Sequence, residues 1–514
     1  MRKATLCALV VLLCAGLCAM IHAAGGSEKV EGVIRPPAVA AQFYPDSPDA
    51  LRLAVQKFLA DGAPRRVAKP IALIVPHAGY VFSGQIAADA FKQAEGGDYE
   101  VVVILGTNHT IAHFHRVSVF TGQGFRTPLG IAEIDRKIAS ALLAADDDCV
   151  SDQEVHAAEH SIEVEVPFVQ VLFPRARIVP VVVASSERAI SARLGEALAA
   201  VVKDRKALIV ASSDLSHYPS AADAEVVDRE VLDAMASLDP ARLRSTIEAA
   251  MGRHVPDLVT CACGEAPVLA AMEAARRLGA KGGSVISYAN SGQTAFGGAS
   301  HVVGYGAVAF GADAAPMKTK GEMKEPPYSD TFSQAERDAL LAFARESISR
   351  AVTTQTAPLA RGFDDNLRQR RGVFVTLKKG GELRGCIGHT EPDVPLCRLV
   401  GAMAISAALQ DPRFPPVAPG EVPGLEIEIS VLTRLTEGRR ADDIVIGKDG
   451  VVLSKGGKSA LFLPQVAVEQ HWDRPTMLDN LCQKAGMDRL CWREGARFAT
   501  FQAIVFGEDA HRGR

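Results

Sequence analysis

Two apolar runs of this chain lead directly to a histidine. The stretch IALIVPHAGYVFSG (71–84) reaches His77, and VVVILGTNHT (101–110) reaches His109. Short apolar runs of this kind predict buried strands, and in an open α/β sheet the groups that bind ligands lie outside the carboxyl ends of the strands. We therefore ask whether both imidazoles share one crevice.

Two further segments place a histidine beside acidic residues. VHAAEHSIEVEVPF (155–168) carries His160 among glutamates, and the strand-like run IVASSDLSHY (209–218) ends with Asp214 and His217. A carboxylate near a histidine orients the ring and sets its tautomer, as it does around metal sites. A serine triad is a rival use of serine, histidine and aspartate, but no glycine of a G-x-S-x-G elbow surrounds any serine of SSDLSHY.

Cys263 opens the helix-like stretch CGEAPVLAAM, where the positive end of the helix dipole would favour a thiolate. Imidazole and thiolate suit iron, copper, zinc or nickel, and three ligands on one side of an ion leave open positions. Each fragment alone also has a structural interpretation: a hydrogen-bonded loop histidine, a turn at Asp214, or a small buried cysteine. Their common position at strand ends favours one shared site.

The elements that would position these side chains alternate between strand and helix. We expect strands at 71–76, 101–106, 178–184, 207–213 and 302–310, and helices at 48–61, 83–95, 186–203, 223–238 and 264–278. This alternation predicts an α/β fold in which a mostly parallel sheet is sandwiched by helices.

The pattern of apolar and polar residues changes after this first half. GADAAPMKTKGEMKEPPYSD (311–330) has no apolar period and is typical of a linker. A helix-like stretch and then alternating strands follow, which predicts a smaller α+β domain. We assign the chain to four parts: 1–23 to a signal peptide or an N-terminal anchor, 34–312 to the first domain, 313–330 to the linker, and 331–509 to the second domain.

Bulk properties limit the function classes. A chain of 514 residues is long enough for two to four domains. Its 48% hydrophobic and 23% charged residues exclude a largely disordered protein, and a net charge of -4 gives no basic face for nucleic acid.

The first 23 residues resemble an export signal. MRK is followed by an apolar run and by small residues near Ala23, which predicts export to the periplasm or another extracytoplasmic space. The alternative is an uncleaved anchor, which would be the only membrane contact. Without this leader seven cysteines remain, so in an oxidising compartment at least one thiol stays free, pairs between chains or binds metal.

Seven ordered motifs resemble the Memo family, also called AmmeMemoRadiSam system protein B. They are RPPAVAAQFYP, PHAGYVFSG, GTNHT, EHSIEVEVPF, SSDLSHY, CGEAP and YANSGQTAFGGASHVVGYGAVAF. The resemblance implies a fold similar to class III non-haem iron (extradiol) dioxygenases and metal-dependent redox chemistry with iron or copper. Carried over by motif, it implies that the metal ligands are His77, His109 and Cys263, with Asp214, His217 and His160 as further pocket residues.

The second half resembles the AMMECR domain, which is protein A of the same system. The resemblance lies in RGVFVTLKKGGELRGCIGH, DPRFPPV, LEIEISVL and GVVLSKGGKSALFLPQVAVEQHWD. The two glycines around Cys386 suggest a tight turn that presents backbone N–H groups, with Arg384 as an anion contact. A purely structural turn with a buried cysteine is an equal alternative.

Three functions follow from these residues and resemblances. The first is a dioxygenase-like, metal-dependent oxidoreductase that uses Fe(II) or copper rather than zinc. In this function His217 acts as acid/base and Asp214 orients it. The AMMECR half handles a small-molecule or peptide substrate. The second is a peptide- or protein-binding module without turnover. The third is a zinc-dependent hydrolase. The system's name also implies a radical-SAM partner, which must be another protein because this chain has no C-x-x-x-C-x-x-C spacing.

Overall fold

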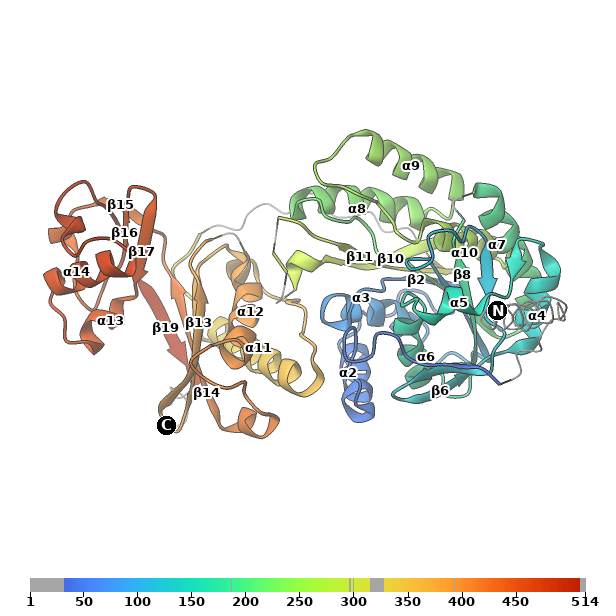
Figure 1. Ribbon diagram of the computed structural model, residues 1–514, viewed down its shortest axis with the longest axis horizontal. Coiled ribbons are helices and arrows are strands. Elements are labelled where there is room, and N and C mark those ends of the chain that lie inside the picture. Colours follow the sequence, from blue (N-terminus) through green and yellow to red (C-terminus); the bar gives the residue numbers. More distant parts are fainter. Residues whose placement is uncertain are drawn as a thin grey trace, which may run out of the picture.

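The computed structural model describes residues 32–185, 187–294, 297–298, 300–314, 328–392 and 394–508, which form a larger and a smaller half (Figure 1). The leader expected at 1–23 and most of the expected linker lie outside these residues. Within the described ranges no helix is both long and apolar enough to span a membrane.

The first half is built on one eight-stranded sheet with the order β10-β11-β2-β9-β3-β8-β4-β7. Its strands are β2 (Ala72–Val75), β3 (Val101–Gly106), β4 (Val117–Val119), β7 (Cys149–Val150), β8 (Arg177–Val183), β9 (Ala207–Ser212), β10 (Gly282–Asn290) and β11 (Gly304–Gly311). The four central strands β2, β9, β3 and β8 are mutually parallel. They are buried almost from end to end, which explains why their sequences are continuous apolar runs.

Helices cover both faces of this sheet. Figure 1 shows α2 and α3 on one side and α8, α9 and α10 on the other. The helices are α2 (Pro48–Ala60), α3 (Tyr80–Gln93), α4 (Arg136–Ala145), α5 (Gln153–Ala157), α6 (Val166–Leu172), α7 (Arg188–Val202), α8 (Ala221–Ala236), α9 (Pro240–Gly252) and α10 (Glu265–Arg277). The expected α/β sandwich is confirmed.

The edges of the sheet depart from the parallel pattern. β10 and β11 pair antiparallel with each other, and β11 pairs antiparallel with β2. β10 was not predicted, because its sequence GGSVISYAN mixes serine and glycine with apolar residues. A small separate sheet joins β1 (Ile34–Arg35), β5 (Gly124–Thr127) and β6 (Gly130–Glu133).

The second half has two four-stranded sheets, which agrees with the predicted α+β class. One contains β13 (Glu382–His389), β12 (Val373–Lys379), β14 (Leu425–Leu432) and β19 (Ala503–Gly507), with helices α11 (Gln334–Thr354) and α12 (Leu396–Leu409). The other contains β15 (Thr436–Arg439), β18 (Arg497–Phe501), β16 (Gly450–Lys455) and β17 (Lys458–Phe462), with helices α13 (Pro464–Glu469) and α14 (Arg474–Lys484). Each sheet has its own apolar core.

The tight turn expected around Cys386 is wrong, because this segment lies inside strand β13. Gly385 is required there for a different reason. A Cβ at this position would lie 2.2 Å from the carbonyl oxygen of Ala407 on α12, so only glycine lets the helix pack directly on the strand.

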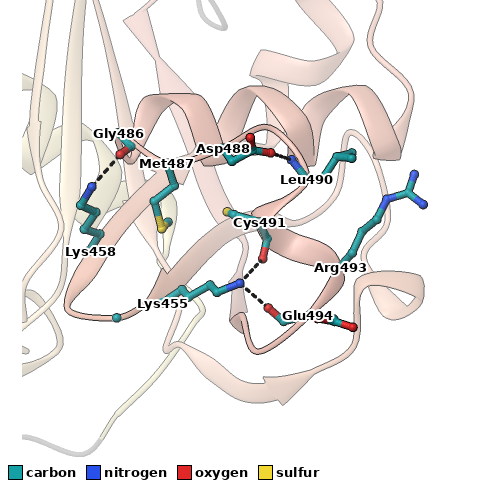
Figure 2. A pocket seen from close by; sticks show the side chains of 10 residues that line it. Lys455, Lys458, Gly486, Met487, Asp488, Leu490, Cys491, Arg493 and Glu494 are labelled. Atoms are coloured by element: carbon teal, nitrogen blue, oxygen red, sulfur yellow. Dashed lines mark hydrogen bonds between the residues drawn. The ribbon is translucent and has the colours of Figure 1, made fainter.

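The last sheet carries a disulfide, Cys482–Cys491, whereas the other five described cysteines are free. A cavity of about 820 Å³ lies beside it (Figure 2). The two lysines that line this cavity are engaged internally: Lys455 Nζ donates to the carbonyl oxygens of Cys491 and Glu494, and Lys458 Nζ donates to that of Gly486. They therefore brace the loop that follows α14.

The two halves touch through charged side chains. α11 lies against α2, where Arg350 pairs with Asp61. Beyond α11, Arg361 donates through both terminal nitrogens to Asp89 of α3, a carboxylate that is 0% exposed. Leu359 of the same segment packs on the apolar core of the first half. The second half is thus joined to α3, the helix that begins three residues after His77.

Replacing Arg361 by alanine is expected to destabilise this junction, because it leaves a buried carboxylate without its cation. Breaking a fully buried pair costs about 3–5 kcal/mol. Arg361 is 36% exposed, so water can replace part of the interaction and we expect roughly 2 kcal/mol. Thermal unfolding in a double-mutant cycle with Asp89→Asn measures the coupling, with Arg368→Ala, an exposed pair with Asp365, as the control. A coupling energy near zero would contradict the expectation.

Candidate metal centre

The candidate site lies where three adjacent parallel strands end. β2, β9 and β3 are neighbours in the sheet, so the residues that follow them meet at one edge. His77 follows β2, His109 follows β3, and Asp214 follows β9. Cys263 reaches the same edge from the start of α10, which packs on β9 and β2. The apolar run that ends at His77 therefore delivers its imidazole to a shared crevice.

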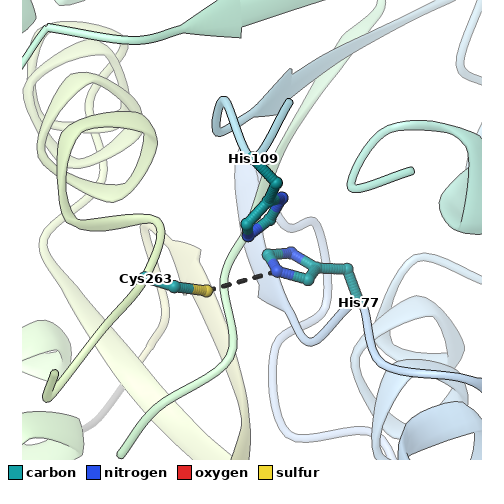
Figure 3. A group of neighbouring side chains, drawn as sticks. All are labelled: His77, His109 and Cys263. Atoms are coloured by element: carbon teal, nitrogen blue, oxygen red, sulfur yellow. Dashed lines mark hydrogen bonds between the residues drawn. The ribbon is translucent and has the colours of Figure 1, made fainter. Parts of the chain in front are cut away.

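His77, His109 and Cys263 converge on one point (Figure 3). One potential ligand atom of each residue lies within 4.8 Å of those of the other two. Nε2 of His77 lies 3.2 Å from Sγ of Cys263, and the two imidazole centroids are 5.1 Å apart. Metal–ligand bonds of about 2.0–2.3 Å place tetrahedral ligand atoms roughly 3.5 Å apart, so small side-chain shifts would bring all three onto one ion.

His77 is held on both its backbone and its ring. Its backbone N–H donates to Oδ1 of Asp214 at 2.8 Å, and Nδ1 lies 2.8 Å from Oγ of Ser212. The ring is buried, and this burial, together with the neighbouring imidazoles of His109 and His160, lowers its pKa well below the usual value. The imidazole is therefore neutral at pH 7, as a metal ligand must be.

His109 is fixed by a carboxylate. Its backbone N–H donates to Oε2 of Glu159 at 2.6 Å, and Nδ1 lies 2.9 Å from Oε1 of the same residue. Burial opposes ionisation of Glu159, but the hydrogen bonds from His109 and from the N–H of Ser161 lower its pKa to about 2. Likewise, burial acts against the charged form of His109, yet Glu159 raises the pKa of His109. The pair orients this ring.

His160 belongs to the same group of side chains. Its ring stacks on that of His109 with centroids 4.6 Å apart, and the ring of Phe43 meets it edge to face with centroids 4.9 Å apart. His109, Glu159 and His160 form a second set whose potential ligand atoms lie within 4.8 Å of one another. Burial lowers the pKa of His160. The structure thus brings this expected pocket residue beside the trio.

Asp214 does not orient His217, so that expectation is wrong. The Asp214 carboxylate instead accepts a hydrogen bond from the backbone N–H of His77. Burial raises its pKa to about 7, although the N–H groups of His77 and Ala78 act in the opposite direction. Within the described residues, Nε2 of His217 is buried and has no hydrogen-bond partner. Burial and then the charge of His109 lower the pKa of His217. The backbone N–H of His217 donates to the carbonyl oxygen of Thr260 at 3.1 Å, three residues before Cys263.

Cys263 is not a thiolate by virtue of its helix, contrary to the expectation. Burial and the charge of Asp214 raise the pKa of its thiol above the usual range, which favours the protonated thiol. A cation at the site would be needed to remove the proton. Cys261, two residues earlier, is fully buried in the apolar core, where burial raises its pKa to about 11. It is not part of the trio.

Arg384 and Cys386 lie in the second half and do not form an open anion site. The Arg384 guanidinium is only 13% exposed and donates to Glu421 at 3.0 and 3.3 Å and to the carbonyl oxygen of Pro415 at 2.9 Å. The expected anion contact is therefore wrong. Sγ of Cys386 accepts a hydrogen bond from Oγ1 of Thr376 at 3.2 Å.

Sequence reasoning noted the glutamates around His160 but assigned no role to the side chains that hold the ligands. Glu159, Glu163 and Glu165 are all buried, as is Ser212. The signal was present in EHSIEVEVPF, where Glu163 and Glu165 alternate with the apolar residues Ile162, Val164 and Val166. Charged residues are almost never fully buried unless they are paired, so such a pattern predicts buried partners.

The donor set fits a transition-metal ion. Two imidazoles and a thiol favour iron, copper or zinc over the hard cations magnesium and calcium, which prefer oxygen ligands. Each histidine also uses its Nδ1 in a hydrogen bond, as metal-binding histidines do with the nitrogen that is not bound to metal. The His109 side chain is 30% exposed, which leaves the site accessible from that side.

Metal affinity is expected to increase with pH. Because the pKa of Cys263 is raised and its thiol must lose a proton on binding, affinity should rise about tenfold per pH unit across the neutral range. Because the pKa of His77 is low, protons do not compete with the metal for its ring in the neutral range. Protonation of His109, whose pKa is raised, would make metal affinity fall more steeply as the pH decreases. Chelator competition with Zn(II) at pH 6.5, 7.5 and 8.5 measures this slope. A flat profile would show that the thiol is not a ligand.

Comparisons with known proteins divide the chain into the same two parts. Residues 35–309 match the profile of the family described as Memo-like protein, and residues 341–506 match the family described as AMMECR1. A MEMO1 family protein of Methanopyrus kandleri is 38% identical over 288 residues, which is 54% of this chain and 98% of the relative. A MEMO1 family protein of Aquifex aeolicus is 37% identical over 273 residues, 53% of this chain and 97% of the relative.

A solved structure also resembles part of the chain. The crystal structure of an uncharacterized protein from Pyrococcus horikoshii is 36% identical and covers 35% of this chain and 96% of its own, with a TM-score of 0.33. The two MEMO1 relatives align along nearly their whole length with only about half of this chain. The match to AMMECR1 lies beyond that half.

Proposed function

Because this chain belongs to the Memo family and joins a Memo-like domain (35–309) to an AMMECR1 domain (341–506), we propose that its first half is a metal-dependent oxidoreductase. His77, His109 and Cys263 hold the metal. The observation that carries the proposal is the convergence of these three donors at one sheet edge. These donors suit iron, copper or zinc, and the proposal takes Fe(II) or copper because both can change oxidation state, unlike zinc.

Each residue of the site has a separate task in this proposal. The metal, when bound, supplies redox chemistry and open positions for a substrate. His217 exchanges a proton with the substrate, because its buried Nε2 has no partner among the described residues. His160 supports the ring of His109 by stacking on it. Asp214 holds the backbone of His77 and so keeps the first imidazole at the edge of the sheet.

The second half is proposed to recognise the substrate or a partner, with a radical-SAM protein of the same system as the candidate partner. The chain is proposed to act outside the cytoplasm. Its signal-like residues 1–23 support this location, and so does the disulfide Cys482–Cys491, since disulfides persist mainly in oxidising compartments. Cell fractionation tests the location, because recovery of the chain from the cytoplasm would contradict it.

The metal content of protein purified without oxygen tests the function. Near-stoichiometric iron or copper, followed by dioxygen uptake in the presence of small-molecule or peptide substrates, is the expected result. Zinc with no response to dioxygen would replace the oxidoreductase by a hydrolase that uses metal-activated water. If the protein stays metal-free after iron, copper and zinc have each been offered, the site is a binding pocket for a peptide or protein segment.

A further inference from the structure

A buried chain of hydrogen bonds runs from Glu165 through Ser212 to His77. Oγ of Ser212 donates to Oε1 of Glu165 at 3.2 Å and lies 2.8 Å from Nδ1 of His77. Glu165 and Ser212 are both 0% exposed. On the other side of the imidazole, Nε2 lies 3.2 Å from Sγ of Cys263. The carboxyl group is thus connected to the candidate metal ligand without touching it.

The direction of these bonds decides which nitrogen of His77 carries the proton. A serine hydroxyl has a single proton. When that proton is donated to Glu165, the Ser212 oxygen can only accept from His77. Nδ1 must then be protonated, and the lone pair is on Nε2, the nitrogen that faces Cys263.

We propose that Glu165 is a positioning residue that acts through Ser212 to hold His77 in the Nδ1–H tautomer, so that Nε2 is presented to the metal. This inference rests on the proposed function, because it treats His77 as a ligand. Without the acceptor, the Ser212 hydroxyl is free to turn and donate to Nδ1. The ring would then carry its proton on Nε2, where it blocks metal binding.

The surroundings of Glu165 argue against a role in stability alone. Its neighbour Glu163 is paired with Arg35 and accepts hydrogen bonds from the backbone N–H groups of Ala38 and Val39. Within the described residues, Oε2 of Glu165 has no hydrogen-bond partner. Its other carboxyl oxygen, Oε1, accepts the hydrogen bond from Ser212. Burying a carboxyl group with so few partners is unfavourable. A need of Ser212 for Glu165 as its hydrogen-bond acceptor explains why a carboxyl group is buried at this position.

The same short segment therefore orients both histidines. Glu159 accepts a hydrogen bond directly from Nδ1 of His109. Glu165, six residues later, acts on Nδ1 of His77 through the hydroxyl of Ser212. In both rings Nδ1 is engaged, which leaves Nε2 as the nitrogen for the metal.

The test compares two replacements of Glu165 in the full chain. Glu165→Leu removes the acceptor at similar volume, whereas Glu165→Gln keeps an oxygen that can accept from Ser212. Zn(II) affinity is measured by chelator competition, and the tautomer of His77 by long-range ¹H–¹⁵N correlation in metal-free protein. We expect Glu165→Leu to bind Zn(II) about 10–100-fold more weakly and to gain the Nε2–H tautomer, while Glu165→Gln stays close to the wild type.

Ser212→Ala provides a second, smaller change in case Glu165→Leu does not fold. It must weaken Zn(II) binding to a similar extent. The inference is overturned if folded Glu165→Leu or Ser212→Ala binds Zn(II) like the wild type and His77 keeps its proton on Nδ1. If the wild type itself binds no Zn(II), iron or copper, the proposed function fails instead, and the NMR comparison in metal-free protein still decides whether Glu165 sets the tautomer.

Discussion

Replacing Cys263 by alanine is expected to reduce metal affinity at least 100-fold. The thiol lies 3.2 Å from Nε2 of His77 and is the single sulfur donor of the trio. A four-ligand zinc site contributes about 10–16 kcal/mol, so one ligand accounts for roughly 3 kcal/mol, which corresponds to ~100-fold in affinity. Chelator competition and elemental analysis measure the loss. The thermal stability of the metal-free protein should change far less, because the side chain is small.

Cys261→Ala is the matched control for this prediction. It removes the same chemical group two residues away, from a side chain that lies in the apolar core rather than at the trio. This variant should keep its metal and lose some stability through the small cavity it creates. Equal metal loss in both variants would point to damage of the α10 start, and metal retention in Cys263→Ala would remove the cysteine from the site.

The position of the histidines could be predicted because it follows from strand direction. Parallel strands end at the same edge, so the runs that lead to His77 and His109 had to deliver both residues to neighbouring places. β2 and β3 flank β9 in the sheet, which also explains the arrival of Asp214. What the sequence could not supply is which atoms meet: Asp214 bonds the backbone of His77 rather than the ring of His217.

The residues that were missed depend on contacts between distant segments. Ser212 and Glu165 are 47 residues apart, and Arg35 and Glu163 are 128 apart. No local spacing predicts such pairs, because tertiary packing decides them. The error at Gly385 has the opposite origin: glycine was interpreted as a local turn signal, whereas its missing side chain admits the backbone of Ala407. Glycine alone does not distinguish these two uses.

Arg35→Ala is expected to destabilise the first half more than any surface change. The guanidinium is 3% exposed, donates to the carbonyl oxygens of His156 and Glu159 at 2.9 and 2.6 Å, and pairs with Glu163, which is 0% exposed. Its removal leaves a buried carboxylate with only neutral donors, such as the Tyr44 hydroxyl. Removing one partner of a buried ion pair costs about 3–5 kcal/mol. At roughly 2–3 °C per kcal/mol for a domain of this size, Tm should fall by roughly 10 °C.

Two controls separate the buried pair from a general loss of charge. Arg177→Ala breaks an exposed pair with Glu133 and should change the free energy of unfolding by less than about 1 kcal/mol. Adding Glu163→Gln to Arg35→Ala removes the unpaired charge, so the double variant should recover part of the lost stability. If it is as unstable as the sum of both single changes, the two side chains act independently. The segment that Arg35 holds also carries Glu159, the hydrogen-bond partner of His109. A coupling between Arg35 and Glu163 would therefore connect the stability of the first half with the position of a proposed metal ligand.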